Sequence, residues 1–292
     1  MISPQQLSEL YQQACEVELQ AFKPGNVSVY ADGHDMTVAD FRLSAEVSAA
    51  PLCNPDYSLG EKIFYAVKAT REAVFCNTNL GIILLCAPLI QAISHTRPDL
   101  TLRQALNQVL TTTTLEDAEW VFKAIRLASP GGLGSSNEQD VAEKPTVNLA
   151  EAMRLASAKD RIALQYMTGY QDIFDFAVLI HYNAKSKWGD QEWAAVSVYV
   201  GLLCQFPDSH IERKYGNKYS EMVVTEMSRL RDELSKAKRP EHTLPLLYRI
   251  DHAFKSMGIN PGTMADMTVA TVLTVFLEEV IKLTLRNKNL PT

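Results

Sequence analysis

The sequence predicts an all-α protein that forms one domain of about a dozen helices over residues 1–292. Most segments carry apolar residues at helical spacing, and clusters of proline and glycine separate these segments. Strand signals are few. The alternating stretch Val27-Ser28-Val29-Tyr30 is short, and the β-branched segment 268–276 lies in an apolar context that favours a buried helix.

The same patterns place the helices in order. The first begins at Ser3-Pro4, which suit the N-cap and the first helical position, and ends before the turn Lys23-Pro24-Gly25-Asn26. The most apolar run of the chain, Leu80 to Ile90, follows Asn77-Thr78-Asn79 and predicts another helix. The turn-rich residues 51–57 predict a loop. The remaining helices are predicted over residues 37–50, 58–75, 101–110, 115–128, 147–168, 170–183, 190–206, 217–237, 243–257 and 261–286.

Composition and charge exclude several classes of protein. Apolar residues make up 47% and charged residues 21%, as in soluble globular proteins, and the net charge of −6 argues against a nucleic-acid partner. Five scattered cysteines without a CxxC pair predict reduced thiols in the cytoplasm. The chain start lacks the features of a signal peptide, and the apolar run is broken at Pro88 and Gln91, too early to span a membrane. A homodimer is left open.

The common catalytic motifs are missing from the sequence: it has no Walker A lysine, no HExxH and no GxSxG. Polar clusters, often with glycine, instead stand at the ends of helices. In the first cluster, Lys23, Gly25 and Asn26 either form a plain C-terminal turn or contact a ligand. His34 and Asp35 follow in a loop, where they could bind a metal or a phosphate-bound water. Asp35 could equally cap the next helix.

The second cluster is Asn77-Thr78-Asn79-Leu80-Gly81. One asparagine can cap the following helix, but capping does not account for three small polar residues in a row. A helix N-terminus with free backbone N–H groups also binds anions, and Gly81 would let a ligand approach the backbone closely. Capping alone and phosphate binding are therefore both open. The glycine-rich residues 129–136 similarly suit either a phosphate nest or a flexible connection.

Acidic residues later in the chain could hold a metal. Asp172 and Asp175 are three residues apart, which places both on one face of an α-helix, either as Mg²⁺ ligands beside a diphosphate or as an exposed acidic face. Gly262 lies at a good helix start, after which Asp266 enters an otherwise apolar helix, where a carboxylate needs a partner or a metal. Arg213 supplies positive charge for a phosphate.

Taken in order, these clusters resemble the triphosphoribosyl-dephospho-CoA synthase family over nearly the whole chain. Its members are all-α enzymes that join the ribose of ATP to dephospho-CoA, release adenine and keep the triphosphate on the transferred sugar. The resemblance rests on Lys23-Pro24-Gly25-Asn26-Val27 (family K-P-G-L-V), Gly33-His34-Asp35-Met36 (the longer G-x-H-x-D-M), Asn77-Thr78-Asn79-Leu80-Gly81 (N-T-H-K-G), Asp208-Ser209-His210-Ile211-Glu212-Arg213 (D-T-N-x-x-R) and Asn260-Pro261-Gly262-Thr263-Met264-Ala265-Asp266 (S-P-G-G-S-A-D).

Two departures mark a divergent branch. Asn79-Leu80 replaces the family's His-Lys, and Thr263 replaces its second glycine. The fold and a phosphoribosyl or nucleotide site therefore carry over better than the substrate does. The alternatives are a same-fold enzyme with another phosphoribosyl donor or acceptor, for example in pterin C1-carrier biosynthesis, and a non-catalytic helical nucleotide-binding or scaffold protein.

The resemblance implies a Mg²⁺-dependent transferase with ATP as substrate. It implies a catalytic set of His34, near the leaving base, with Asp35, Asp172 and Asp266, the three carboxylates contacting the metal or the sugar. The nucleotide-binding set is Lys23, Gly25, Asn26, Asn77, Thr78, Asn79, Gly81, Arg213 and Gly262. Within this set the phosphates are assigned to Lys23, Asn77, Thr78, Asn79 and Arg213.

Overall fold

The computed structural model describes residues 2–31, 33, 36–97, 99–130 and 139–288. Within these ranges the chain forms fourteen α-helices, a π-helical segment and a short 3₁₀-helix. The predicted all-α class is confirmed, since backbone pairing in these ranges is limited to isolated bridges at Ser28–Ala31 and Gly33–Met36. None of the described helices combines the length and apolar character needed to cross a membrane.

The helices cover most of the described chain. Their bounds are α1 (Pro4–Gln20), α2 (Val38–Cys53), α3 (Leu59–Val74), α4 (Leu80–Ile93), α5 (Leu102–Thr111), α6 (Leu115–Ala128), α7 (Leu149–Ala156), α8 (Arg161–Thr168), the π-helix η1 (Asp172–Ala177), α9 (Val178–Trp188), α10 (Gln191–Gln205), α11 (Ser209–Tyr215), α12 (Ser220–Lys236), the 3₁₀-helix η2 (Pro240–Thr243), α13 (Leu244–Ser256) and α14 (Gly262–Lys288).

Local sequence explains where many of these helices begin. Five of them, α1, α2, α3, α5 and α6, start with a capping box, in which a Ser or Thr side chain and a residue three positions later satisfy each other's backbone N–H groups. At α1 the pair is Ser3 and Gln6, with Pro4 as the first helical residue. These starts agree closely with the predicted ones because capping is a local property.

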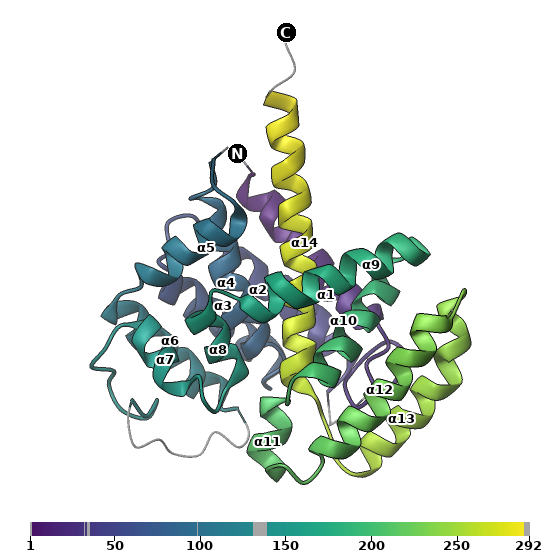
Figure 1. Ribbon diagram of the computed structural model, residues 1–292. Coiled ribbons are helices and arrows are strands. Elements are labelled where there is room, and N and C mark those ends of the chain that lie inside the picture. The colour runs from purple at the N-terminus through teal and green to yellow at the C-terminus, as the bar shows by residue number, and fades with distance from the viewer. Residues whose placement is uncertain (1, 32, 34–35, 98, 131–138, 289–292) are drawn as a thin grey trace.

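The long helix α14 runs through the middle of the molecule, with α1, α4 and α10 packed around it (Figure 1). Its residues from Met267 to Leu277 are all buried, which confirms the buried helix predicted for 268–276. Thr268, Thr271 and Thr274 are satisfied inside the core because each hydroxyl donates to the carbonyl four residues back, at 2.7 Å.

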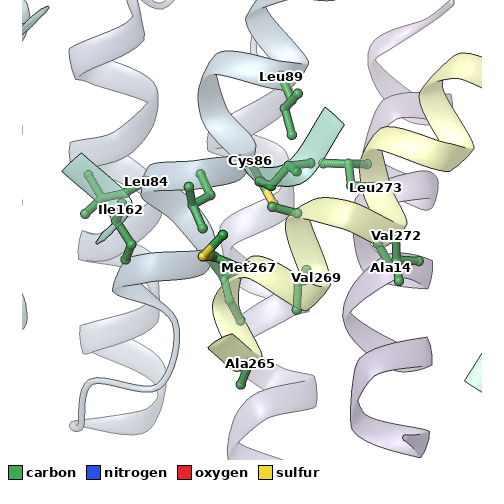
Figure 2. Packing of buried hydrophobic residues seen from close by; sticks show 14 of the residues in the cluster. Ala14, Leu84, Cys86, Leu89, Ile162, Ala265, Met267, Val269, Val272 and Leu273 are labelled. Atoms are coloured by element: carbon green, nitrogen blue, oxygen red, sulfur yellow. The ribbon is translucent and has the colours of Figure 1, made fainter. Parts of the chain in front are cut away.

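The contact between α14 and α4 forms the centre of the apolar core. Figure 2 shows side chains of both helices meeting there, with α1 beside α14. Every residue of α4 except Gln91 is buried. A helix that is apolar on all faces in this way is stable only inside the protein. The labelled residues are Leu84, Cys86 and Leu89 of α4, Ala265, Met267, Val269, Val272 and Leu273 of α14, Ala14 of α1 and Ile162 of α8.

Three predicted boundaries are wrong. The helix predicted over 147–168 is two helices, because the Asp160 side chain accepts a hydrogen bond from Ala163 N at 3.0 Å and so begins a new helix. The loop predicted over 51–57 begins only at Asn54, because α2 continues through Pro51 to Cys53. The segment predicted as helix over 170–183 begins as the π-helix η1, which alters the spacing of its side chains around the axis.

The turn after α1 is held from inside the protein. The fully buried Lys23 donates from Nζ to the carbonyl oxygens of Glu18 (2.7 Å) and Val27 (2.8 Å) and lies 3.2 Å from the Glu18 carboxylate. Gly25 N donates to Asp251 Oδ1 of α13 at 2.8 Å. These contacts fix the turn against α13 and place Asn26 at the edge of a pocket described below.

Substituting Gly25→Ala is expected to destabilise the fold strongly. Gly25 has φ +84°, and an added Cβ would lie 2.7 Å from the Ile259 carbonyl oxygen. Gly189→Ala is the matched control, because Gly189 has φ +72° but nothing within 4 Å. We expect a loss of about 1–2 kcal/mol in the free energy of unfolding for the control and about 3 kcal/mol or more for Gly25→Ala. Equal losses in urea unfolding would contradict this account.

Candidate functional site

A pocket of ≈ 270 Å³ lies where the N-terminal ends of α4, α8 and α14 meet. One wall, from α6 and α7, is apolar and includes Ile125 and Met153. The polar lining residues come from α1 and the turn after it, the segments before α4 and α8, α11 and the start of α14. The polar lining residues are Glu18, Asn26, Asn77, Thr78, Asp160, His210, Arg213, Asn260, Thr263 and Asp266.

The three residues of the Asn-Thr-Asn cluster before α4 make different contacts. Asn77 Oδ1 accepts a hydrogen bond from Leu80 N at 3.2 Å, so this residue satisfies the start of the helix. The hydroxyls of Thr78 and Ser44 lie 2.6 Å apart, which ties the segment to α2. Asn77 and Thr78 also line the pocket.

Asn79 turns away from the pocket and into the protein. It is buried, and its Nδ2 lies 3.4 Å from both the Ser44 carbonyl oxygen and Ser48 Oγ of α2. Leu80, the next residue, does line the pocket. Asn79 and Leu80 are the two positions at which this segment departs from N-T-H-K-G. Of these two, only Leu80 lies where a ligand could touch it.

Asp266 enters the pocket from the first turns of α14. It has no hydrogen-bond or ion-pair partner within the described part of the chain, although it is only partly exposed. Burial, the main cause, and the negative charges of Glu18 and Asp208 raise its pKa well above the usual range, while Arg213 opposes the shift. Asp266 is thus an acid that holds its proton unusually well.

Gly81 makes the close approach of α4 to α14 possible. A Cβ at this position would lie 2.0 Å from Asp266 Oδ2 and 2.8 Å from Ile162 Cδ1. No side chain larger than hydrogen fits there without moving the carboxylate. The glycine of the Asn-Thr-Asn-Leu-Gly motif is therefore required by a neighbouring side chain of the protein.

Ion pairs and caps join α8, α11 and α14 around the pocket. Arg213 Nη1 of α11 lies 2.5 Å from Asp160 Oδ2, and Asp160 also caps α8. Asp208 caps α11 by accepting from His210 N (2.8 Å), and it accepts from Met264 N of α14 at 2.9 Å. Burial raises the pKa of Asp208 to about 6, while its hydrogen bonds from backbone N–H groups lower it. Asp208 therefore couples two helices that both line the pocket.

The structure brings most of the predicted site residues together. His34 and Asp35 lie outside the described residues, as do positions 131–138, which include most of the glycine-rich stretch. The predicted residues that line the pocket are Asn26, Asn77, Thr78, Gly81, Arg213, Gly262 and Asp266.

Lys23 and Gly25 occupy structural positions instead. The Lys23 ammonium is fully buried among the Glu18 carboxylate and backbone carbonyl oxygens, so it does not reach a phosphate in the pocket. Burial lowers its pKa, against the opposing charge of Glu18. Gly25 and Lys23 together shape the turn that carries Asn26.

Asp172 also lies outside the pocket lining. Its Oδ2 accepts hydrogen bonds from Arg161 Nε (3.0 Å) and Gln165 Nε2 (2.7 Å). Asp175, its expected partner, instead pairs with Arg103 of α5. The shared helix face predicted for these aspartates does not form, because this segment is π-helical and each carboxylate has its own arginine.

The sequence reasoning missed two lining carboxylates, Glu18 and Asp160. Glu18 could have been noticed as a charged residue on the buried side of α1, and Asp160 as an N-cap residue inside a predicted helix. Within the described ranges, no group of three or more His, Cys, Asp or Glu side chains is arranged to hold a metal ion. Of the two predicted metal ligands that the structure describes, Asp172 and Asp266, only Asp266 lines the pocket.

Comparison with known proteins gives a structural relative and a family. A solved structure from Archaeoglobus fulgidus, described as a "putative triphosphoribosyl-dephospho-coA synthase", is similar with a TM-score of 0.62 and 25% identity, covering 80% of this chain and 97% of that chain. None of the curated proteins matches the sequence. The sequence pattern of the ATP:dephospho-CoA triphosphoribosyl transferases matches residues 4–284. The resemblance is thereby confirmed, and the chain belongs to the ATP:dephospho-CoA triphosphoribosyl transferase family.

Proposed function

We propose that this protein transfers the triphosphoribosyl group of ATP to dephospho-CoA, or to a related acceptor, in the cytoplasm and releases adenine. Family membership supports the reaction class. The observation that carries the site assignment is the unpaired carboxyl group of Asp266, held with a raised pKa between the N-termini of α4 and α14. The residues of one pocket can then supply the acid, the phosphate contacts and the apolar surface that this reaction needs.

The proton balance of the reaction suits a single carboxyl group. The bond from ribose C1′ to adenine breaks, the bond from C1′ to the acceptor oxygen forms, and a proton passes from the acceptor hydroxyl to adenine. A protonated Asp266 would give its proton to the departing adenine. The resulting carboxylate would stabilise the positive charge on the sugar and then take the proton of the acceptor hydroxyl. The raised pKa favours this starting state.

Phosphate binding is assigned to the helix ends around the pocket. The N-termini of α4 and α14 present backbone N–H groups and a favourable dipole to an anion. Because Asn77 Oδ1 already accepts from Leu80 N, the Asn77 amide group is left to donate to a ligand. Arg213 adds a charged donor whose partner, Asp160, is itself partly exposed.

The apolar wall suits the adenine ring. Ile125, Met153 and Ile162 line the pocket with no charged group among them. A purine is flat and largely apolar on its faces, so aliphatic side chains contact it well. The base would lie against this wall, and the triphosphate would lie toward the helix ends.

Magnesium is proposed to arrive with the nucleotide, as MgATP. Glu18 and Asp160 are already paired with Lys23 and Arg213, so these carboxylates are poorly suited to form a resident metal site. The bound ion would neutralise charge on the triphosphate. Asp266 is the one proposed metal contact that the described pocket retains, and we assign it to the sugar and the transferred proton.

A second candidate is the same transfer with a different acceptor or donor. The observation that favours it is Leu80, which lines the pocket at the position of the family's lysine. Loss of that cation weakens binding of a highly charged substrate, so an acceptor with fewer phosphates becomes competitive. Adenine release from ATP with another acceptor, but not with dephospho-CoA, would favour this candidate.

Asp266→Asn should abolish most of the activity while ATP still binds. The variant keeps the size of the side chain but cannot transfer a proton, so we expect adenine release to fall about 10²- to 10⁴-fold. Asp175→Asn is the matched control, because this exposed carboxylate pairs with Arg103 away from the pocket. Adenine is measured by chromatography and ATP binding by calorimetry. A variant within threefold of the wild-type rate would refute the role of Asp266.

The pH profile should reveal the same group. Because Asp266 begins the reaction protonated, kcat/KM should fall as the pH rises through its pKa, which lies above the ordinary aspartate range. The Asp266→Asn variant should lose that descending limb. A wild-type rate that rises with pH across this region would show that the ionised form starts the reaction.

Gly81→Ala should damage the site more than Gly262→Ala. The methyl group at 81 would collide with Asp266 Oδ2, whereas the nearest atom to a Cβ at 262 is His210 Cγ at 3.6 Å. We expect adenine release by Gly81→Ala to fall at least 10²-fold, since small displacements of reacting groups have effects of this order. Thermal unfolding of the two variants checks that both fold. Equal activities would contradict the assignment of this contact.

A further inference from the structure

The hydroxyl groups behind the α4 N-terminus form two short buried series of hydrogen bonds, and each series ends at a backbone carbonyl oxygen of α2. Ser44 Oγ donates to the Asp40 carbonyl oxygen at 2.6 Å, as helical serines commonly do toward the residue four positions back. A hydroxyl has only one proton. The 2.6 Å contact between Ser44 Oγ and Thr78 Oγ1 must therefore be donated by Thr78.

The second series, through Tyr11 and Ser48, also runs toward a carbonyl oxygen of α2. Ser48 Oγ donates to the Ser44 carbonyl oxygen at 2.6 Å, so it can only accept from Tyr11 Oη at 3.0 Å. Tyr11, Ser44 and Ser48 have no exposed surface, so solvent is not in place to reverse these bonds. The directions are set by the backbone of α2, which has carbonyl oxygens to offer and no free N–H groups at these positions.

This direction determines what Thr78 can offer a ligand. Thr78 is a lining residue of the pocket, and with its proton committed to Ser44 its hydroxyl has only lone pairs left to offer a ligand. Phosphate oxygens are acceptors as well, and would not bind to it. Thr78 therefore requires a ligand group that donates.

Two other lining residues also offer acceptor oxygens. Glu18 and Asp266 are carboxyl groups with oxygen acceptors, and the Gly81 backbone lies against Asp266. A sugar carries several hydroxyl donors close together. We infer that Thr78, held by Ser44, accepts a hydrogen bond from a ribose hydroxyl of the nucleotide and is a specificity-determining residue for the sugar. This inference rests on the proposed use of ATP.

A metal ion could use the same lone pairs, and the test must separate the two. The described residues form no group of three metal-binding side chains, which favours the hydroxyl. Magnesium titrated alone into the nucleotide-free protein distinguishes the cases. Binding of the ion that Thr78→Val removes would overturn the inference.

The test compares ATP with 2′-deoxy-ATP and 3′-deoxy-ATP by calorimetry. For the wild type, one analogue should bind about tenfold more weakly than ATP, because it leaves the Thr78 acceptor unpaired. In Thr78→Val the difference between that analogue and ATP should disappear, and in Thr78→Ser it should persist. Thr70→Val is the control: it removes a buried hydroxyl without a partner from α3, so it should keep the wild-type ratio.

Ser44→Ala gives an independent check that leaves the lining unchanged. It frees the Thr78 proton, so the preference for ATP over the deoxy analogue should shrink several-fold while ATP still binds. Equal penalties in wild type and Thr78→Val, or no penalty for either analogue, would overturn the role of Thr78 but leave ATP binding, and with it the proposed function, standing. A wild type that binds no ATP would overturn both. Thermal unfolding of each variant confirms that a fold is present.

Discussion

The contact between Gly81 of α4 and Asp266 of α14 is the constraint on which the site depends. Asp266 is the one charged residue between Gly262 and Leu277, in a helix otherwise built for the core. Its carboxyl group is tolerated because it lines a pocket and is not enclosed in the apolar core. The glycine lets the helices approach, and that approach holds the carboxyl group where two helix N-termini point.

Charge pairing in the surrounding residues sets Asp266 apart. Lys23 neutralises Glu18, and Arg213 neutralises Asp160, so these carboxylates are held by protein partners. Asp266 has none in the described chain and keeps its proton through burial and through the negative charge nearby. In one pocket, therefore, two carboxylates are paired within the protein and a third is unpaired in the described chain, and the third is the one to which we assign the proton transfer.

The hydrogen bonds of the hydroxyl groups behind α4 fix which groups of the pocket donate and which accept. A helix N-terminus favours any anion, and carboxyl groups favour any donor, so neither selects a nucleotide by itself. Thr78 can only accept a hydrogen bond from a ligand, because its own proton is donated within the protein. The donors of Asn77 and the acceptor of Thr78 lie next to each other in sequence. In the proposed roles, Asn77 binds phosphate and Thr78 binds the sugar.

The sequence by itself determined the fold class, most helix starts and the polar clusters that line the pocket. These depend on local patterns: capping residues, apolar spacing, and glycine at the head of a helix. Only the tertiary structure decided which polar residue faces a ligand. Lys23 and Asn79 look like binding residues in the sequence but turn inward, because Glu18 and the α2 backbone satisfy them. Asp172 is held by Arg161 because a π-helix forms where an α-helix is predicted. Hydrogen-bond partners distant in sequence decide such roles, and local spacing does not encode them.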